Sequence, residues 1–374
     1  MNTDLFGLEI NVWADAAIRL QIIVLVMTVV VMGLIWAERR LLGRFQQRIG
    51  PQKTGPFGLL QSVADAVKLI GKEDLRPKNA DPWTFELAPF LVFIPIFMGF
   101  IAVPFLAGWN IKILELGLLY FVAISSVNIV GWVMAGWGSD NRYAMIGGLR
   151  AAAQSISYEL PLVLSLLSVA MLAGTLNVDE IVRQQGSVPY IVWQPMAFAI
   201  FFIAALAELN RAPFDIPVGE SEVVGGPFVE YSGMRWSMFM LAEYAGLFIM
   251  ALLGSAVFLG GYAWPLGEEL GLGWQLVLVS AKAGLLIFVV FWIRASLPRL
   301  RIDQLMGYSW KILLPLVLAQ ILVNGLVLVY GWSEVILGVV GLFGVVALVT
   351  ITGRAANRPR SIPARPVVLE GKAA

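Results

Sequence analysis

Long apolar runs divide the chain into membrane-crossing segments joined by more polar loops. A helix needs about 20 largely apolar residues to cross the roughly 30 Å hydrocarbon core of a bilayer. Nine stretches meet or approach this length, at residues 18–37, 87–107, 116–137, 159–176, 191–208, 237–260, 275–294, 312–331 and 335–352. The pattern predicts an all-α fold, a polytopic transmembrane helix bundle of about nine spans.

One loop segment has a different periodicity. Phe57, Leu60, Val63, Val67 and Ile70 recur every three or four residues, and polar side chains lie between them. A helix over about 56–72 would therefore be amphipathic, but it is too short and too polar to cross the bilayer. Such helices lie in the plane of the membrane interface.

The remaining segments complete the predicted organisation. We expect a single transmembrane domain over 1–352 and a cytoplasmic, poorly ordered C-terminal tail over 353–374. Residues 1–16 contain Asp4, Glu9 and Asp15 in place of a basic segment, so we expect a mature N-terminus and not a cleaved signal peptide.

The basic residues predict the orientation. With the N-terminus outside and nine spans alternating, 22 of the 26 Lys and Arg residues fall on the cytoplasmic side. Only Arg19, Lys112 and Arg183 then lie outside, and Lys282 falls within the seventh span. Because cytoplasmic loops are enriched in Lys and Arg, we expect the C-terminus to be cytoplasmic.

Composition narrows the chemistry. Of the 374 residues 59% are hydrophobic and only 14% charged, whereas a soluble domain is about 25% charged. Cysteine and histidine are both absent, which excludes disulfides, thiolate metal sites and histidine-ligated haem or metal. We therefore expect no metal bound by this chain, and a redox role would need electron carriers in partner subunits.

Acidic residues at the ends of the predicted spans are the main candidates for function. Glu38, Glu159, Glu208 and Glu243 all fall near the cytoplasmic ends of their helices, so they could converge in one layer. Ionisable groups at membrane depth are costly and typically belong to ion or proton pathways. The alternative is that each carboxylate lies at the headgroup boundary and pairs with a nearby arginine.

Two cytoplasmic loops carry opposite charge. The segment from Glu208 to Glu243 has six acids against two arginines and contains Pro213 and Pro217, so irregular backbone there should line a buried cavity. The first loop instead has five basic residues within 39–53. For the acidic segment, the alternative is a solvated loop that binds a basic partner. For the basic first loop, two interpretations are open: contact with anionic lipid, or docking of a cytoplasmic subunit.

Motifs of soluble enzymes and of nucleotide-phosphate binding are absent, and we expect no nucleic-acid partner. A series of other motifs resembles the H subunit of bacterial NADH:quinone oxidoreductase (respiratory complex I), the counterpart of mitochondrial NADH dehydrogenase subunit 1. The resemblance covers about 15–331 and rests on ordered segments: Glu-Arg-Arg-Leu-Leu-Gly-Arg (38–44), Gln-Gln-Arg-Ile-Gly-Pro (46–51), Ala-Asp-Ala-Val-Lys-Leu (64–69), Arg-Ala-Ala-Ala-Gln-Ser-Ile-Ser-Tyr-Glu (150–159), Ala-Glu-Leu-Asn-Arg-Ala-Pro-Phe-Asp-Ile-Pro (207–217), Glu-Ser-Glu (220–222), Glu-Tyr-Ser-Gly-Met (230–234), Leu-Ala-Glu-Tyr (241–244) and Arg-Ala-Ser-Leu-Pro-Arg (294–299).

The resemblance implies a translocase subunit in the bacterial inner membrane without a redox centre or a directly catalytic residue. It would help to bind quinone and would couple its reduction to proton pumping. The residues implied to line or brace the quinone chamber are Arg39, Asp65, Arg211, Asp215, Glu220, Glu222, Arg294 and Arg299. Those implied to begin the proton path are Glu38, Glu159, Glu208, Glu230 and Glu243.

The implied partners are the peripheral quinone-site subunits, small membrane subunits and lipid, with FMN and iron–sulfur clusters in partner subunits. The chain departs from the family at Val218, where an acid is common, at Gly-Gly-Pro-Phe (225–228), and in having a ninth span. Two alternatives remain: the homologous membrane subunit of an energy-converting hydrogenase-type complex, or a free-standing proton-coupled transporter.

Overall fold

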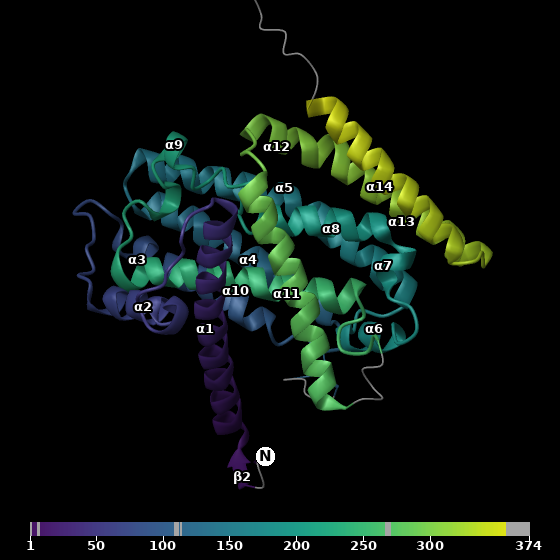
Figure 1. Ribbon diagram of the computed structural model, residues 1–374, viewed down its shortest axis with the longest axis horizontal. Coiled ribbons are helices and arrows are strands. Elements are labelled where there is room, and N and C mark those ends of the chain that lie inside the picture. The colour runs from purple at the N-terminus through teal and green to yellow at the C-terminus, as the bar shows by residue number, and fades with distance from the viewer. Residues whose placement is uncertain (1, 6–7, 108–111, 113, 266–270, 357–374) are drawn as a thin grey trace, which may run out of the picture.

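The computed structural model describes all residues except 1, 6–7, 108–111, 113, 266–270 and 357–374 (Figure 1). Among the described residues, eight helical segments are long and apolar enough to cross a membrane, which confirms the predicted polytopic helix bundle. The principal helices are α1 (Val12–Phe45), α3 (Pro82–Gly99), α4 (Gly117–Gly138), α5 (Arg142–Ala173), α8 (Pro195–Glu208), α10 (Gly233–Phe258), α11 (Leu272–Ser296), α13 (Leu314–Tyr330) and α14 (Val335–Ala356).

Shorter elements connect them. These are η1 (Pro56–Gly58), α2 (Gln61–Gly71), α6 (Val178–Gln184), α7 (Tyr190–Trp193), α9 (Glu220–Val223), η2 (Gly226–Phe228), α12 (Ile302–Tyr308) and the π-helical η3 (Ser309–Leu313). The segment Ile302–Tyr330 forms one continuous span from α12 through η3 to α13. The predicted C-terminal tail lies almost wholly outside the described residues.

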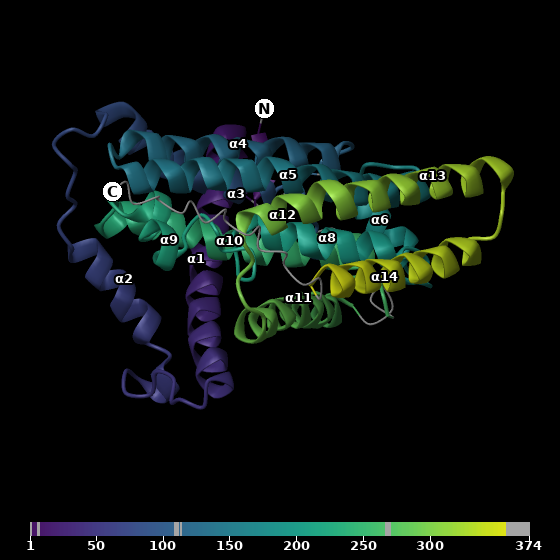
Figure 2. The same ribbon diagram turned by 90° about the horizontal axis from the view of Figure 1, so that it is seen from above.

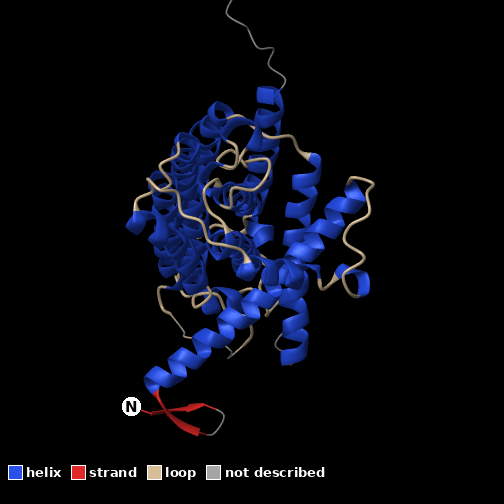
Figure 3. Ribbon diagram, turned by 90° about the vertical axis from the view of Figure 1, so that its left-hand side faces the viewer, coloured by secondary structure: helices blue, strands red, loops and turns tan. Residues whose placement is uncertain are grey.

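A small hairpin precedes the first helix and was not predicted. Strands β1 (Asn2–Leu5) and β2 (Leu8–Asn11) pair antiparallel, with Asn2 opposite Asn11 and Leu5 opposite Leu8 (Figure 3). The hydrophobic pattern did not predict these strands, because two four-residue strands are too short to be distinguished beside a 34-residue helix.

The fifth predicted span is broken in two. Helix α8 has 14 residues and is about 21 Å long, which is short of the hydrocarbon thickness. Helix α7 ends at Trp193, and Gln194 has a non-helical backbone (φ −131°, ψ 57°) directly before Pro195. A proline at the first helical position favours such a new start, so the apolar run is divided between two helices.

Helix α10 is the centre of the bundle. Within its most apolar 18-residue stretch 83% of the residues are buried, against 17% for α1 and 22% for α14. Small residues such as Gly246 and Gly254 allow this burial, because an added Cβ at Gly254 would lie 2.9 Å from the ring of Phe201 on α8. In Figure 1, α1 and α11 run steeply across the other helices, and both contact α10.

Helix α2 stands away from the main bundle and contacts α1 and α10 (Figure 2). Its apolar side chains remain uncovered in the isolated chain: Val63, Val67 and Ile70 are 44%, 64% and 67% exposed. The preceding residues do not extend the helix, because Phe57 has a left-handed backbone (φ 57°). An amphipathic helix with an uncovered apolar face is suited to the membrane interface.

Candidate functional site

The connection between α8 and α10 folds back into the protein. Arg211, Phe214 and Ile216 are no more than 5% exposed. A close backbone approach fixes the centre of this loop: Gly226 has φ 58°, and a Cβ there would lie 1.9 Å from the carbonyl oxygen of Pro217. Only glycine fits at such a position, so the Gly-Gly-Pro-Phe segment that departs from the family allows the loop to close on itself.

This loop borders an open cavity of about 680 Å³. The charged residues along its wall are Arg211, Asp215, Glu220, Glu243, Arg294 and Arg299, and the apolar or aromatic ones include Trp132, Leu209, Val218, Phe228, Trp236, Met240 and Tyr244. The loop, α4, α10 and α11 all contribute. A cavity lined by both aromatic and charged side chains can accommodate a partly polar organic ligand.

Arg211 is the electrostatic centre of the cavity wall. Its Nη1 donates to Glu38 Oε2 at 2.7 Å, and its Nε lies 3.1 Å from Glu243 Oε1. The guanidinium also lies over the ring of Tyr244, 4.3 Å from the ring centroid, and Arg294 donates to the other oxygen of Glu38. Four elements, α1, the loop, α10 and α11, thus meet at one buried group.

The surroundings keep this guanidinium charged. Burial acts to lower the pKa of Arg211, but the nearby carboxylates of Glu243 and Glu38 outweigh it and hold the pKa above its ordinary value. The Nη2 of Arg211 is buried and has no hydrogen-bond partner in the described part of the chain. Because the side chain of Arg211 has no exposed surface, this donor carries the cost of an unsatisfied buried group, about 1–3 kcal/mol.

A second ion pair lies on the same wall. Arg299 Nη2 donates to Asp215 Oδ2 at 2.7 Å, and Leu300 N donates to the carbonyl of Pro213. Burial raises the pKa of Asp215, and the opposing effect of Arg299 is smaller. The segment after α11 therefore braces the loop while leaving a carboxyl group that is more easily protonated than usual.

Five of the eight predicted chamber residues line the cavity: Arg211, Asp215, Glu220, Arg294 and Arg299. The other three lie outside its lining. Arg39 pairs with Asp65 at 2.6 Å between α1 and α2, and Glu222 pairs with Arg150 of α5 at 2.6 Å. Burial acts to raise the pKa of Asp65, but hydrogen bonding and charge from Arg39 hold it below its usual value.

The predicted proton-path acids fall into three places. Glu38 and Glu243 meet at Arg211. Glu208, at the end of α8, has a buried Oε2 without a hydrogen-bond partner among the described residues, and it interacts electrostatically with Glu159 of α5. Glu230 lies apart and accepts from Asn141 at 2.6 Å.

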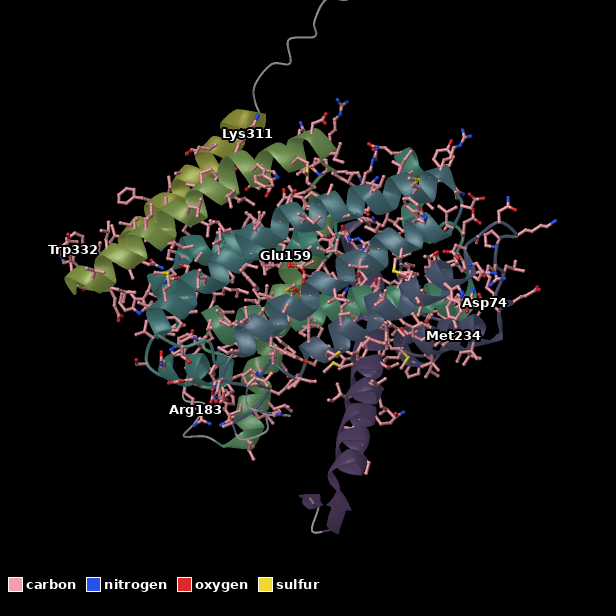
Figure 4. The ribbon with its side chains drawn as sticks, turned by 180° about the vertical axis from the view of Figure 1, so that it is seen from behind. Asp74, Glu159, Arg183, Met234, Lys311 and Trp332 are labelled. Atoms are coloured by element: carbon pink, nitrogen blue, oxygen red, sulfur yellow. The ribbon has the colours of Figure 1, made fainter. Side chains whose placement is uncertain are left out.

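Figure 4 shows Glu159 amid the packed helices, whereas the labelled Asp74 and Arg183 lie at the rim of the molecule. Glu208 also borders a small cavity of about 40 Å³ whose other polar residues include Asn128. The Oδ1 of Asn128 is buried and unsatisfied within the described chain. Two such oxygens beside a space of this size fit one or a few water molecules.

Several site residues were missed by sequence reasoning. Arg150 and Asn141 hold two of the predicted acids, and Trp132, Trp236 and Phe228 form the aromatic wall. Aromatic residues in apolar spans are usually packing residues, so only the fold distinguishes these. Over the residues that the structure describes, no group of three or more acids is arranged to hold a metal ion.

Comparison with known proteins gives consistent matches. A family model described as NADH dehydrogenase matches residues 18–325. The chain is 51% identical over 296 residues to the NADH-quinone oxidoreductase H subunit of Geobacillus kaustophilus, covering 78% of this chain and 88% of the relative. It is 49% identical to the H subunit of Brevibacillus brevis (79% and 88% covered) and 46% identical to that of Dehalococcoides mccartyi strain CBDB1 (83% and 86% covered).

Proposed function

The chain belongs to the family of the NADH-quinone oxidoreductase H subunit, and from this premise we propose that it forms the membrane half of a quinone chamber and starts a proton path. It is an integral membrane subunit of that oxidoreductase complex. The finer proposal concerns what its cavity binds and where its buried carboxylates lead.

The observation that carries the proposal is the cavity of about 680 Å³ beside the buried Arg211. Its aromatic and apolar lining suits a quinone ring, and the charge of the buried Arg211 behind the wall would favour an oxyanion that develops there during reduction. Negative charge that appears on the quinone during reduction would interact electrostatically with Glu38 and Glu243, which both pair with Arg211. Reduction would thereby change the proton affinity of two buried carboxylates.

A proton path is proposed from the same geometry. Glu208 lies three residues before Arg211 and interacts with Glu159 across the α5–α8 contact. The order Glu243 and Glu38, then Glu208, then Glu159 would carry protonation changes away from the cavity toward a neighbouring membrane subunit. Glu230, bound to Asn141, is assigned to the rim of this path.

The electrons are proposed to come from partner subunits. The sequence has no cysteine and no histidine, so FMN and iron–sulfur clusters would be held by the peripheral subunits that close the chamber. We further propose that α7 and α8 together make the fifth of nine crossings, so that the N-terminus faces outward and the C-terminus the cytoplasm, because this orientation places most basic residues inside. Arg39 with Asp65, and Arg150 with Glu222, would then brace the chamber from its edges.

A photoreactive quinone analogue tests the chamber directly in the intact complex. We expect labelling of the cavity wall near Trp236 or Met240 on α10, and competition by an excess of unlabelled quinone. A labelling site confined to the exposed outer faces of α13 or α14 would contradict the proposal. Transport by the purified subunit in liposomes without partners would instead favour a free-standing transporter.

A further inference from the structure

Gln154 ties together the two ends of the loop that carries Arg211. Its side chain is on α5 and is 2% exposed. The amide nitrogen donates to the carbonyl oxygen of Ala207 at 2.7 Å and to that of Phe214 at 2.8 Å. These two carbonyls are seven residues apart and flank the turn that contains Glu208 and Arg211.

The two carbonyls do not need Gln154 to be satisfied. Ala207 O already accepts from the backbone N–H of Asn210 at 3.1 Å, and Phe214 O accepts from that of Ile216 at 2.9 Å. A buried carbonyl with one partner carries little penalty. The contribution of Gln154 is therefore mainly one of position, because a single nitrogen with two hydrogens joins both ends of the turn.

Position matters here because Arg211 must meet two carboxylates on two different helices. Its guanidinium lies 2.7 Å from Glu38 of α1 and 3.1 Å from Glu243 of α10. Even a small opening of the turn would lengthen one of these contacts. One helical turn after Gln154, the ring of Tyr158 packs on Phe214 at 5.6 Å, and its hydroxyl donates to Leu305 O.

We infer that Gln154 is a positioning residue of the site, which holds Arg211 between Glu38 and Glu243 by closing the turn from Ala207 to Phe214. The inference rests on the proposed function, because it assigns Gln154 to quinone reduction through Arg211. It also links α5, which carries Glu159, to the cavity wall. Gln154 itself lies outside the cavity lining.

The chain offers a matched control. Gln185, after α6, uses its amide nitrogen in the same way, donating to Ile181 O at 3.1 Å and to Ala256 O at 3.0 Å, and it is fully buried. It lies away from the cavity, beside the C-terminal part of α10. Replacement of either glutamine by methionine keeps the volume and removes the amide donor. In Gln185 it also removes an acceptor, because Gln185 Oε1 accepts from Tyr190 N at 3.0 Å, so the control variant loses one hydrogen bond more.

The test measures NADH:quinone activity of the whole complex in membranes, divided by its NADH oxidation with an artificial acceptor. We expect Gln154→Met to lower this ratio about tenfold or more, and Gln185→Met to leave it within about twofold. Equal losses in both variants, or no loss in Gln154→Met, would overturn the inference. If Gln154→Met does not assemble, Gln154→Asn is the second variant. It keeps the amide donor but moves it away from the two carbonyls, because the side chain is one methylene shorter. Unchanged kinetics in Gln154→Asn would also overturn the inference.

A double-mutant cycle with Arg211→Lys separates the inference from the proposed function. Arg211→Lys alone should lower quinone turnover, and a normal rate would contradict the proposed function. In the Arg211→Lys background, Gln154→Met should add less than about twofold, because the group it positions has already been changed. Fully multiplicative losses would show that Gln154 acts independently of Arg211.

Discussion

At the scale of single residues, Glu208 and Glu243 differ in what surrounds their carboxylates. Glu243 is paired with Arg211, whereas one oxygen of Glu208 is buried without a hydrogen-bond partner in the described structure. Glutamine keeps the shape of each side chain and removes its ability to exchange a proton. We expect Glu208→Gln and Glu243→Gln each to lower quinone reduction and proton pumping about tenfold or more, with normal assembly.

The measurement is quinone-dependent NADH oxidation together with pH-dependent dye quenching in vesicles. Glu180→Gln is the matched control, because Glu180 is an exposed acid on α6 outside the proposed path. Full activity of both Glu208→Gln and Glu243→Gln would contradict the proton-path assignment. A similar loss in Glu180→Gln would indicate a general effect of removing acids.

At this scale the sequence predicted the important charges but not their partners. The positions of Glu38 and Glu243 at the ends of apolar spans marked them as candidates, and motif resemblance marked Arg211. Their meeting at one guanidinium depends on how α1 and α10 pack, which no local pattern encodes. For the same reason the contribution of Gln154 was missed, because a single glutamine in a polar stretch of helix carries no signal.

At the scale of elements, Lys282 fixes the end of α10. Its ammonium donates to the carbonyls of Leu259 and Gly261, both at 2.6 Å, and to that of Trp264. All three hydrogens are used, at a helix end where a positive charge is favourable. We expect Lys282→Met to lower the free energy of unfolding by about 3 kcal/mol, measured as an earlier thermal transition of the subunit in the complex.

The exposed Lys78 provides the comparison for this measurement. Because Lys78→Met removes a solvated charge, its thermal transition should be unchanged. An unchanged transition in Lys282→Met would show that water replaces the ammonium at the three carbonyls. The sequence located this lysine inside a span but could not predict its carbonyl partners, because they lie in a turn about 20 residues away.

The contact between α1 and α2 bears on how the peripheral subunits of the complex (the peripheral arm) dock on this chain. Arg40 donates to Phe57 O at 2.9 Å and lies over the rings of Trp36 and Phe57, while Arg39 pairs with Asp65. Charge reversal at Arg39 and Arg40 should weaken retention of the peripheral arm on native gels, because both the basic surface and the seating of α2 are altered.

A neutral change distinguishes these two causes. Ser62 Oγ on α2 donates to Met32 O of α1 at 2.9 Å, so Ser62→Ala loosens the same contact without changing charge. Normal arm retention in Ser62→Ala together with loss in the charge-reversal variant would indicate electrostatic docking. Unchanged retention in the charge-reversal variant would contradict a docking role for these arginines.

At the scale of the whole molecule, helix α14, the ninth predicted span, lies apart from the loop between α8 and α10 that carries Arg211 and α9. Figure 1 shows α9 of the site loop far from α14, which runs beside α13. The region matched by the family model ends at residue 325, before α14 begins. The length and apolar pattern of α14 were predictable, but its place in the fold was not, because a uniformly apolar helix carries no information about its partner.

Glycines on α14 define where it packs. Gly338 lies against Val192 O, and added Cβ atoms at Gly341 and Gly344 would lie 2.8 Å from Pro195 and 2.0 Å from Met196. Helix α14 therefore covers the break between α7 and α8. A continuous helix at that position would not need such a cover. Close approach at small residues is a common way for membrane helices to associate.

This arrangement predicts that removal of residues 331–374 separates stability from activity. Removal would uncover the break between α7 and α8, so the temperature of the subunit's thermal transition should fall. In the full-length chain, Gly344→Leu should lower the free energy of unfolding by about 1–3 kcal/mol through overpacking. The cavity wall, formed by the loop with α4, α10 and α11, would be unchanged, so quinone activity per assembled complex should stay within about twofold. A strong loss of quinone activity in complexes that assemble normally would show that α14 acts on the site through α8, whose last residue is Glu208.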